Sequence, residues 1–323
     1  MEELIIIPTP LVLAEEVSRA VGCEVWVKRD DQTHPRYGGN KVRKLGPLLA
    51  LARRDGVTHV LTLGAAGSHH VLATAVHGAA QGFVVEAALA PQRRSAHVEA
   101  MLRASSSQAA RIHPCRSFPG ALATVALRAA ALRASGARPR IIPFGGSNAV
   151  GASGYLDAQV ELAGQLAALG VPAPDAQVCA LGSGGTLAGL LAGCGLAGGR
   201  AEVWGVRVAP SFATPAWRVA TLARAALRLR GGDGRCPTAR FFDGAIGAGY
   251  GIATDDGRRA AELFARDGLT LDDTYTAKAA AGLIAIARLH PRRYLFWHTL
   301  SSSPMGPLLG EAPVAASLRG LLA

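Results

Sequence analysis

The most informative stretch of the chain is Tyr37-Gly38-Gly39-Asn40-Lys41-Val42-Arg43-Lys44-Leu45, in which a lysine follows two glycines and an asparagine. Glycine lets the backbone adopt unusual dihedral angles and approach a ligand closely. A lysine held at such a turn can be shielded from water, which lowers its pKa and makes it a nucleophilic amine. Such an amine can form a Schiff base with an aldehyde cofactor. The alternative is a lysine that merely begins a solvated helix, and the rest of the chain has to decide between the two.

A second glycine-rich segment has the pattern of a phosphate-binding loop. Gly182-Ser183-Gly184-Gly185-Thr186 follows an apolar strand-like run and precedes an apolar helical run. A helix N-terminus offers unpaired N–H groups and the positive end of the helix dipole, and glycines let a phosphate approach. Residue 187 is leucine, so the segment is neither a nucleotide-binding G-x-x-x-x-G-K-[ST] loop nor a G-x-G-x-x-G fingerprint. Taken alone, it could also be a tight structural turn.

These two segments belong to a series of short motifs whose order along the chain is informative. The further motifs lie at residues 25–31, 62–70, 142–155, 250–251, 275–276 and 298–299. Together they resemble pyridoxal-phosphate enzymes of the tryptophan-synthase-beta type (fold type II), closest to the family of 1-aminocyclopropane-1-carboxylate deaminase and D-cysteine desulfhydrase. The resemblance runs over nearly the whole chain. Each motif is weak by itself, and their common order makes the resemblance specific.

The alternation of short apolar runs with segments of helical period independently predicts parallel sheets with right-handed crossovers. The fold class that we expect is α/β, with two three-layer domains of mainly parallel sheets, and the resemblance implies a cofactor in the cleft between them. The expected strands are 57–63, 83–89, 140–144, 177–181, 202–208 and 294–297. The expected helices are 68–81, 94–104, 121–134, 155–169, 186–196, 258–266 and 277–289.

The resemblance also implies a discontinuous domain organisation. A large cofactor-binding domain is expected from residues 1–44 and 154–323. A smaller domain, residues 45–153, is expected as an insertion between them. Lys41 and the loop at residues 182–186 would then come from separate parts of the large domain to one cofactor.

The resemblance implies pyridoxal 5'-phosphate as the cofactor and gives several residues a role. The catalytic candidates are Lys41, which would hold the cofactor and take the substrate's α-proton, Ser68 and Tyr275. The cofactor-binding candidates are Asn40, Lys41, His69, Gly182, Ser183, Gly184, Gly185, Thr186, Thr276 and Thr299. The substrate-binding candidates are Ser68, His70, Tyr250 and Tyr275. Ser68 could equally be the N-cap of a helix, and the two tyrosines could be core residues whose hydroxyls bond elsewhere.

Thr276 bears on the reaction. The position matching Thr276 is a glutamate in the deaminase, where it keeps the ring nitrogen of the cofactor protonated. Threonine can offer only a neutral hydrogen bond, as in the desulfhydrases, and Thr299 also matches a desulfhydrase threonine. We therefore expect a lyase that acts on a small amino acid by β-elimination, giving a keto acid and ammonia. The alternatives are deaminase-like ring opening, β-replacement, or a homologue that binds the cofactor without turnover.

Two departures from the family pattern leave the substrate open. His69 stands where the family has an asparagine that bonds the ring hydroxyl of the cofactor, and imidazole is bulkier and can titrate near neutral pH. The segment Leu300-Ser301-Ser302 replaces two glycines that the family usually has after His298-Thr299. The adjacent His69 and His70 do not form a zinc signature, and no metal site is expected.

Composition bears on partners and compartment. The 34 basic and 23 acidic residues give a formal net charge of +11, but the basic residues are dispersed at helical spacing, which argues against nucleic-acid binding. Residues 176–199 carry no charge, yet they include eight glycines, so a buried strand, loop and helix explain them better than a membrane span. The five cysteines include no C-x-x-C pair, and the acidic start does not resemble a signal peptide. We expect a cytoplasmic enzyme, and from the resemblance a homodimer.

Overall fold

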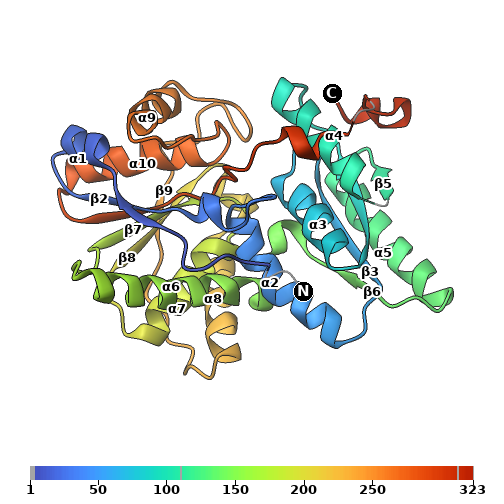
Figure 1. The fold of residues 1–323 in the computed structure, drawn as a ribbon, viewed down its shortest axis with the longest axis horizontal. Helices are drawn as coiled ribbons and strands as arrows, with labels where there is room; N and C mark the ends of the chain where they lie inside the picture. The colour runs from blue at the N-terminus through green and yellow to red at the C-terminus, as the bar shows by residue number, and fades with distance from the viewer. Residues whose placement is uncertain (1–3, 110, 311–312, 323) are drawn as a thin grey trace. The chain divides into compact units, whose positions relative to one another are not determined.

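The computed structural model of the protein describes residues 4–109, 111–310 and 313–322 (Figure 1). The chain divides into two compact units. The first unit comprises Met1–Lys44 and Ser147–Ser302, and the second comprises Leu45–Gly146 and Ser303–Ala323. Both units are α/β with mainly parallel strands, as the sequence predicts.

The first unit is built on a six-stranded sheet in the order β1-β2-β10-β7-β8-β9. All neighbouring strands are parallel except β1 and β2, which form an antiparallel edge. The strands are β1 (Leu11–Leu13), β2 (Val25–Lys28), β7 (Ala176–Leu181), β8 (Glu202–Arg207), β9 (Arg240–Phe242) and β10 (Tyr294–Trp297). The helices are α1 (Glu15–Val21), the start of α2 (Asn40–Arg54), α6 (Ala149–Leu169), α7 (Gly185–Ala197), α8 (Ala216–Leu229), α9 (Asp255–Arg266) and α10 (Thr276–Leu289).

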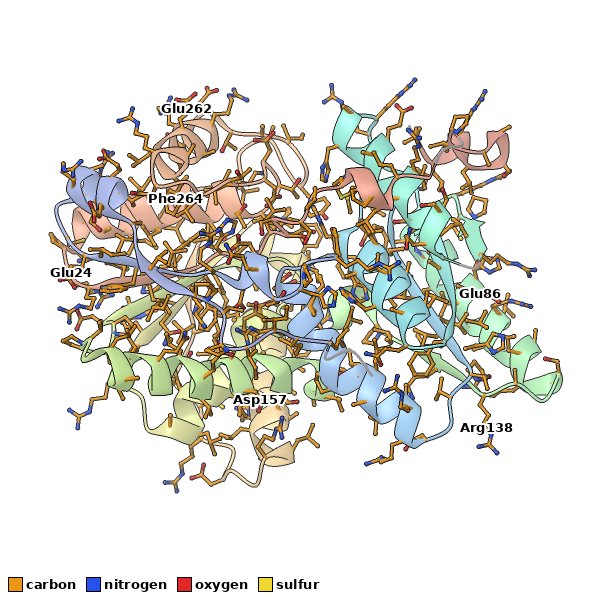
Figure 2. The ribbon with its side chains drawn as sticks, viewed as in Figure 1. Glu24, Glu86, Arg138, Asp157, Glu262 and Phe264 are labelled. Carbon is orange, nitrogen blue, oxygen red and sulfur yellow. The ribbon has the colours of Figure 1, made fainter. Side chains whose placement is uncertain are left out.

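Helices cover both faces of this sheet. Helices α6, α7 and α8 pack on one face and α1, α9 and α10 on the other, as Figure 1 shows. Phe264 of α9, labelled in Figure 2, packs edge-on against Phe296 of β10 with their ring centroids 5.1 Å apart. The uncharged segment 176–199 forms β7, the glycine loop and α7, as expected. None of the helices in the described residues is long and apolar enough to span a membrane.

The second unit is built on a four-stranded parallel sheet in the order β5-β4-β3-β6. Helix α5 packs on one face, and α3 and α4 pack on the other. The strands are β3 (His59–Ala65), β4 (Val84–Ala90), β5 (Arg111–Pro114) and β6 (Pro139–Ile141). The helices are the rest of α2, α3 (His69–Ala80), α4 (Ala96–Gln108) and α5 (Phe118–Ala134), with short 3-10 turns at Phe144–Gly146, Gly306–Leu308 and Ala316–Leu321.

The C-terminal segment corrects one expected boundary. Residues 303–323 were expected in the large domain, but they belong to the second unit. Leu318 and Leu321 join a hydrophobic cluster with Val71, and the N–H of Gln92 donates to the carbonyl of Leu321 over 3.0 Å. These contacts join positions far apart in the sequence, which no local pattern reveals.

The return of the chain to the first unit also comes earlier than expected. The family resemblance places residues 147–153 in the inserted domain. In the structure, the Asn148 side chain caps α6 by accepting from the N–H of Gly151 over 2.8 Å. The helix therefore begins at Ala149, and residues 147–153 belong to the first unit.

A buried ionic network ties the first turn of α2 to the rest of this unit. The guanidinium of Arg43 is 2% exposed and donates twice to Asp30, over 2.7 and 2.8 Å. It also donates to Glu161 of α6 over 2.8 Å, and Lys28 forms an ion pair with Glu161. Tyr155 donates to Asp30 over 2.7 Å. Because each charge is paired, removing any one of them would leave an uncompensated buried charge.

Close backbone packing at Gly154 yields a prediction on stability. A Cβ atom at Gly154 would overlap the carbonyl oxygen of Arg43, and that backbone cannot move without breaking its ionic network. Gly154→Ala should lower the free energy of unfolding by about 3 kcal/mol or more. The matched control is Gly164→Ala in the same helix, where a Cβ meets nothing within 4 Å. This control should be neutral or raise stability by up to about 1 kcal/mol. Urea unfolding of the two variants measures the difference, and equal midpoints would contradict the packing argument.

Candidate active site

Lys41 lies in the first turn of α2, and the glycines before it permit close backbone contacts. Gly39 has a φ of 89°, and a Cβ there would lie 2.8 Å from the carbonyl oxygen of Thr299. The N–H of Asn40 donates to that same carbonyl over 3.1 Å. The N–H of Gly38 donates to the hydroxyl of Ser301 over 2.9 Å. The serine segment that departs from the family pattern therefore holds the turn that carries Lys41.

The environment of Lys41 lowers the pKa of its amine. Burial lowers the pKa of Lys41 to about 8, although the negative charge of Asp272 acts in the opposite direction. The Nζ atom donates to the side-chain Oδ1 of Asn40 over 2.6 Å and lies 5.5 Å from the ring centroid of Tyr275. About a tenth of Lys41 is then unprotonated at pH 7, a far larger share than for a lysine in water, and this share is the nucleophilic form.

Asn40 links this amine to the glycine loop. Its oxygen accepts from Lys41 Nζ, and its Nδ2 donates to Thr186 Oγ1 over 3.0 Å. Gly184 precedes α7 with a φ of 89°, so the loop turns through a conformation that favours glycine. The side chain of Asn40 therefore connects the predicted lysine directly to the predicted phosphate loop.

Lys44 is a second buried amine of this helix, and sequence reasoning did not single it out. Its side chain is 1% exposed, and within the described residues it forms no ion pair. Burial and the neighbouring charge of Lys41 hold its pKa well below the usual range. A buried ammonium without a counter-charge is costly, so an anion would be stabilised beside it. The signal was the spacing of three residues from Lys41, which places both side chains on one side of the helix.

Tyr250 and Tyr275 lie next to this group. Their hydroxyls are hydrogen-bonded to each other, and their rings meet edge-on with centroids 5.8 Å apart. A Cβ at Gly182 would lie 3.1 Å from the ring of Tyr275, so this ring contacts the start of the glycine loop. Burial, and next the neighbouring Tyr250, raise the pKa of Tyr275 well above its usual value. Burial also raises the pKa of Tyr250, so both hydroxyls remain protonated, and one of their two protons lies in the hydrogen bond between them.

Thr276 is held by Asp272, a residue that sequence reasoning missed. The Thr276 hydroxyl donates to the Asp272 carboxylate over 2.7 Å and accepts from the Asp272 N–H over 2.7 Å. A hydroxyl has one proton and two lone pairs, so Thr276 can offer a further partner only a lone pair. The carboxylate also accepts from the N–H groups of Tyr275 and Thr276 over 2.9 and 3.0 Å. An aspartate just before a helix is a capping signal that could have revealed it.

Thr299 differs from Thr276 in its hydrogen bonding. It lies directly after β10 and is 8% exposed. Its carbonyl accepts from Asn40, whereas within the described residues its hydroxyl has no hydrogen-bond partner. Thr299 can therefore donate a hydrogen bond, which Thr276 cannot.

The remaining predicted site residues lie in the second unit. Ser68 is the N-cap of α3, where its hydroxyl accepts from the N–H of Val71 over 3.3 Å. The ring of His69 lies 5.1 Å from the ring of His97. His70 is 2% exposed, and its Nε2 lies 3.0 Å from the hydroxyl of Thr62. The capping interpretation of Ser68 is thus confirmed, and the roles of all three residues toward substrate or cofactor stay predictions.

Comparison with known proteins agrees with these features. The sequence profile of the family described as "Pyridoxal-phosphate dependent enzyme" matches residues 2–299. A nocardicin C-9' epimerase of Nocardia uniformis subsp. tsuyamanensis is 37% identical over 299 residues, covering 90% of each chain. A D-cysteine desulfhydrase of Salmonella choleraesuis (strain SC-B67) is 37% identical over 292 residues, covering 87% of each chain. A solved structure described as an ACC deaminase homologue superposes with a TM-score of 0.84 at 29% identity, covering 93% of this chain and 91% of the other.

The lowered pKa of Lys41 can be tested on protein freed of any cofactor. The rate of acetylation of Lys41 by acetic anhydride, followed by peptide mass spectrometry, should rise with pH around a midpoint near 8. Asp272→Asn should move this midpoint lower, because the Asp272 charge raises the pKa of Lys41. Circular dichroism checks that the variant keeps its helices. A midpoint near the usual 10.5, or no change in Asp272→Asn, would contradict the electrostatic account.

Proposed function

Because the chain belongs to the family of pyridoxal-phosphate dependent enzymes, we propose that it is a lyase that removes a β-substituent from a small amino acid. The activity that we propose is of the D-cysteine desulfhydrase kind, in which elimination followed by hydrolysis gives a keto acid and ammonia. The observation that carries this proposal is the Lys41 amine, joined by Asn40 to the glycine loop at residues 182–186. Identity of 37% to a D-cysteine desulfhydrase supports the substrate class.

The described residues fit the cofactor. The glycine loop at the N-terminus of α7 suits a phosphate, which would also stabilise the charged form of the buried Lys44 amine. The lowered pKa of Lys41 suits an aldehyde. We propose that Gly182, Ser183, Gly184, Gly185 and Thr186 hold the phosphate. When bound, pyridoxal phosphate supplies an electron sink for the negative charge that develops at the substrate's α-carbon.

Lys41 would act as the base of the reaction. An amine with a pKa of about 8 can accept the α-proton near neutral pH and release it again. Tyr275, whose ring lies 5.5 Å from Lys41 Nζ, would donate a hydrogen bond near the leaving group, with Tyr250 as its partner. We propose Thr299 as the donor to the ring nitrogen of the cofactor, because the Thr276 proton already goes to Asp272.

The roles proposed for the second unit rest on the resemblance. Ser68 would bind the substrate near the reacting carbon, with the N–H groups at the start of α3. His69 would donate to the ring hydroxyl of the cofactor, and His70 would line the substrate side. We further propose a cytoplasmic homodimer: the described cysteines are all free thiols, which suits a reducing compartment, and the dimer follows from the family. Sedimentation equilibrium tests the dimer.

One test of the proposed function concerns the attachment of the cofactor. Protein saturated with pyridoxal phosphate and reduced with borohydride should carry the cofactor on Lys41. Lys44 is the internal control, because it is also buried with a lowered pKa but should remain unmodified. Peptide mass spectrometry identifies the lysine. An adduct on another lysine, or none at saturation, would refute the proposed function.

Another test of the proposed function concerns the reaction. D-cysteine and β-chloro-D-alanine should release keto acid, and 1-aminocyclopropane-1-carboxylate should react slower by about tenfold or more, equivalent to ~1.4 kcal/mol in the barrier. The reason is that neither Thr276 nor Thr299 places a charged group where the deaminase has glutamate. Comparable rates would contradict the assignment and would implicate the Asp272 carboxylate behind Thr276.

The relative named nocardicin C-9' epimerase favours a second candidate function. An epimerase returns the α-proton to the opposite face and releases no keto acid. Chiral chromatography of the same reactions distinguishes the two. Interconversion of D- and L-amino acids without keto acid would replace elimination by epimerisation.

A further inference from the structure

Ser147 lies beside the glycine loop and was given no role by the sequence. Its side chain is buried, with 7% exposed, at the residue where the chain re-enters the first unit. Its hydroxyl accepts from the N–H of Gly185 over 3.2 Å and lies 2.7 Å from the hydroxyl of Ser183. Two groups of the loop thus meet at one hydroxyl from elsewhere in the chain.

Gly185 permits this contact. A Cβ at Gly185 would lie 2.5 Å from Ser147 Oγ and 3.1 Å from Ser147 Cβ. The absence of a side chain at this position therefore lets Ser147 approach the first N–H groups of α7. Those N–H groups have no partner within the helix and are the ones that an anion would use.

The direction of the hydrogen bonds follows from chemistry. The Gly185 N–H can only donate, so it occupies one lone pair of Ser147 Oγ. The oxygens of a phosphate monoester mainly accept, so a phosphate at the loop would draw the proton of Ser183 toward itself. Ser147 must then donate to Ser183. With a phosphate bound, the hydrogen bonds would then align from Gly185 N–H through Ser147 and Ser183 to the phosphate, and each bond would polarise the next.

We propose that Ser147 is a positioning residue of the phosphate site, which orients the Ser183 hydroxyl as a donor to a phosphate monoester. This inference rests on the proposed function, because the phosphate is that of the cofactor. Ser147 acts through Ser183, so its loss should weaken recognition of the phosphate while leaving recognition of the aldehyde intact.

The test compares pyridoxal phosphate with pyridoxal, which lacks the phosphate. Equilibrium titration of the cofactor-free protein gives the dissociation constants of pyridoxal and of pyridoxal phosphate. The dissociation constant of pyridoxal divided by that of pyridoxal phosphate is the ratio that measures how much the phosphate adds to binding. Ser147→Ala should reduce this ratio by about tenfold, because Ser183 would no longer be oriented to donate its hydrogen bond to the charged phosphate. Ser183→Ala should reduce it at least as much, and the double variant no more than Ser183→Ala, because the two residues act in series.

Controls separate this role from a general loss of structure. Ser153→Ala removes another buried hydroxyl, in helix α6 just after Ser147, which is bonded to the carbonyl of Val150, and should leave the ratio unchanged. Ser147→Thr keeps the hydroxyl and should retain the wild-type ratio. If Ser147→Ala does not fold, Ser147→Thr and Ser183→Ala still test the chain of bonds.

The outcomes also separate this inference from the proposed function. An unchanged ratio in Ser147→Ala, equal weakening of both ligands, or additive losses in the double variant would overturn the role of Ser147. The borohydride adduct on Lys41 would still form in the wild type in each of those cases. Absence of that adduct would overturn the proposed function and this inference together.

Discussion

Close contacts that only glycine permits hold the first turn of α2 inside the protein, and the candidate site depends on them. A Cβ at Gly38 would overlap the carbonyl of Asp31, one at Gly39 would lie 2.8 Å from the carbonyl of Thr299, and one at Gly154 would overlap Arg43. These contacts bury the turn, and burial is the cause of the lowered pKa of Lys41. Packing therefore produces the nucleophile, because the same lysine in water would be almost fully protonated at neutral pH.

The charges around this turn divide into a compensated and an uncompensated group. Arg43 is fully paired with Asp30 and Glu161, so it fixes the helix without attracting a ligand. Lys44 lacks such a pair within the described residues and Lys41 has a lowered pKa, so this side of α2 favours an anion and an aldehyde. Asp272 moderates the effect by keeping the pKa of Lys41 from falling further. The two buried amines of this turn, Lys41 and Lys44, thus lie where the cofactor is expected.

The sequence predicted the elements whose signal is local. The apolar run before Gly182 and the glycines after it identified β7, the loop and α7. The edge strands β1 and β9 were missed because three residues are too few to show a period of two. Lys41 and the loop could be paired only through the family resemblance. The sequence could not predict which group accepts the hydroxyl proton of Thr276, or that Ser147 lies beside Ser183. Both depend on contacts that form only in the folded protein.

One ligand is expected to join the Lys41 amine to the glycine loop. A crystal structure of the protein grown with pyridoxal phosphate would show whether it does. Continuous electron density from Lys41 Nζ to the cofactor, with the phosphate hydrogen-bonded to N–H groups of residues 183–186, is the result that we predict. A cofactor bound elsewhere, or a phosphate away from the loop while Lys41 stays unmodified, would contradict the account.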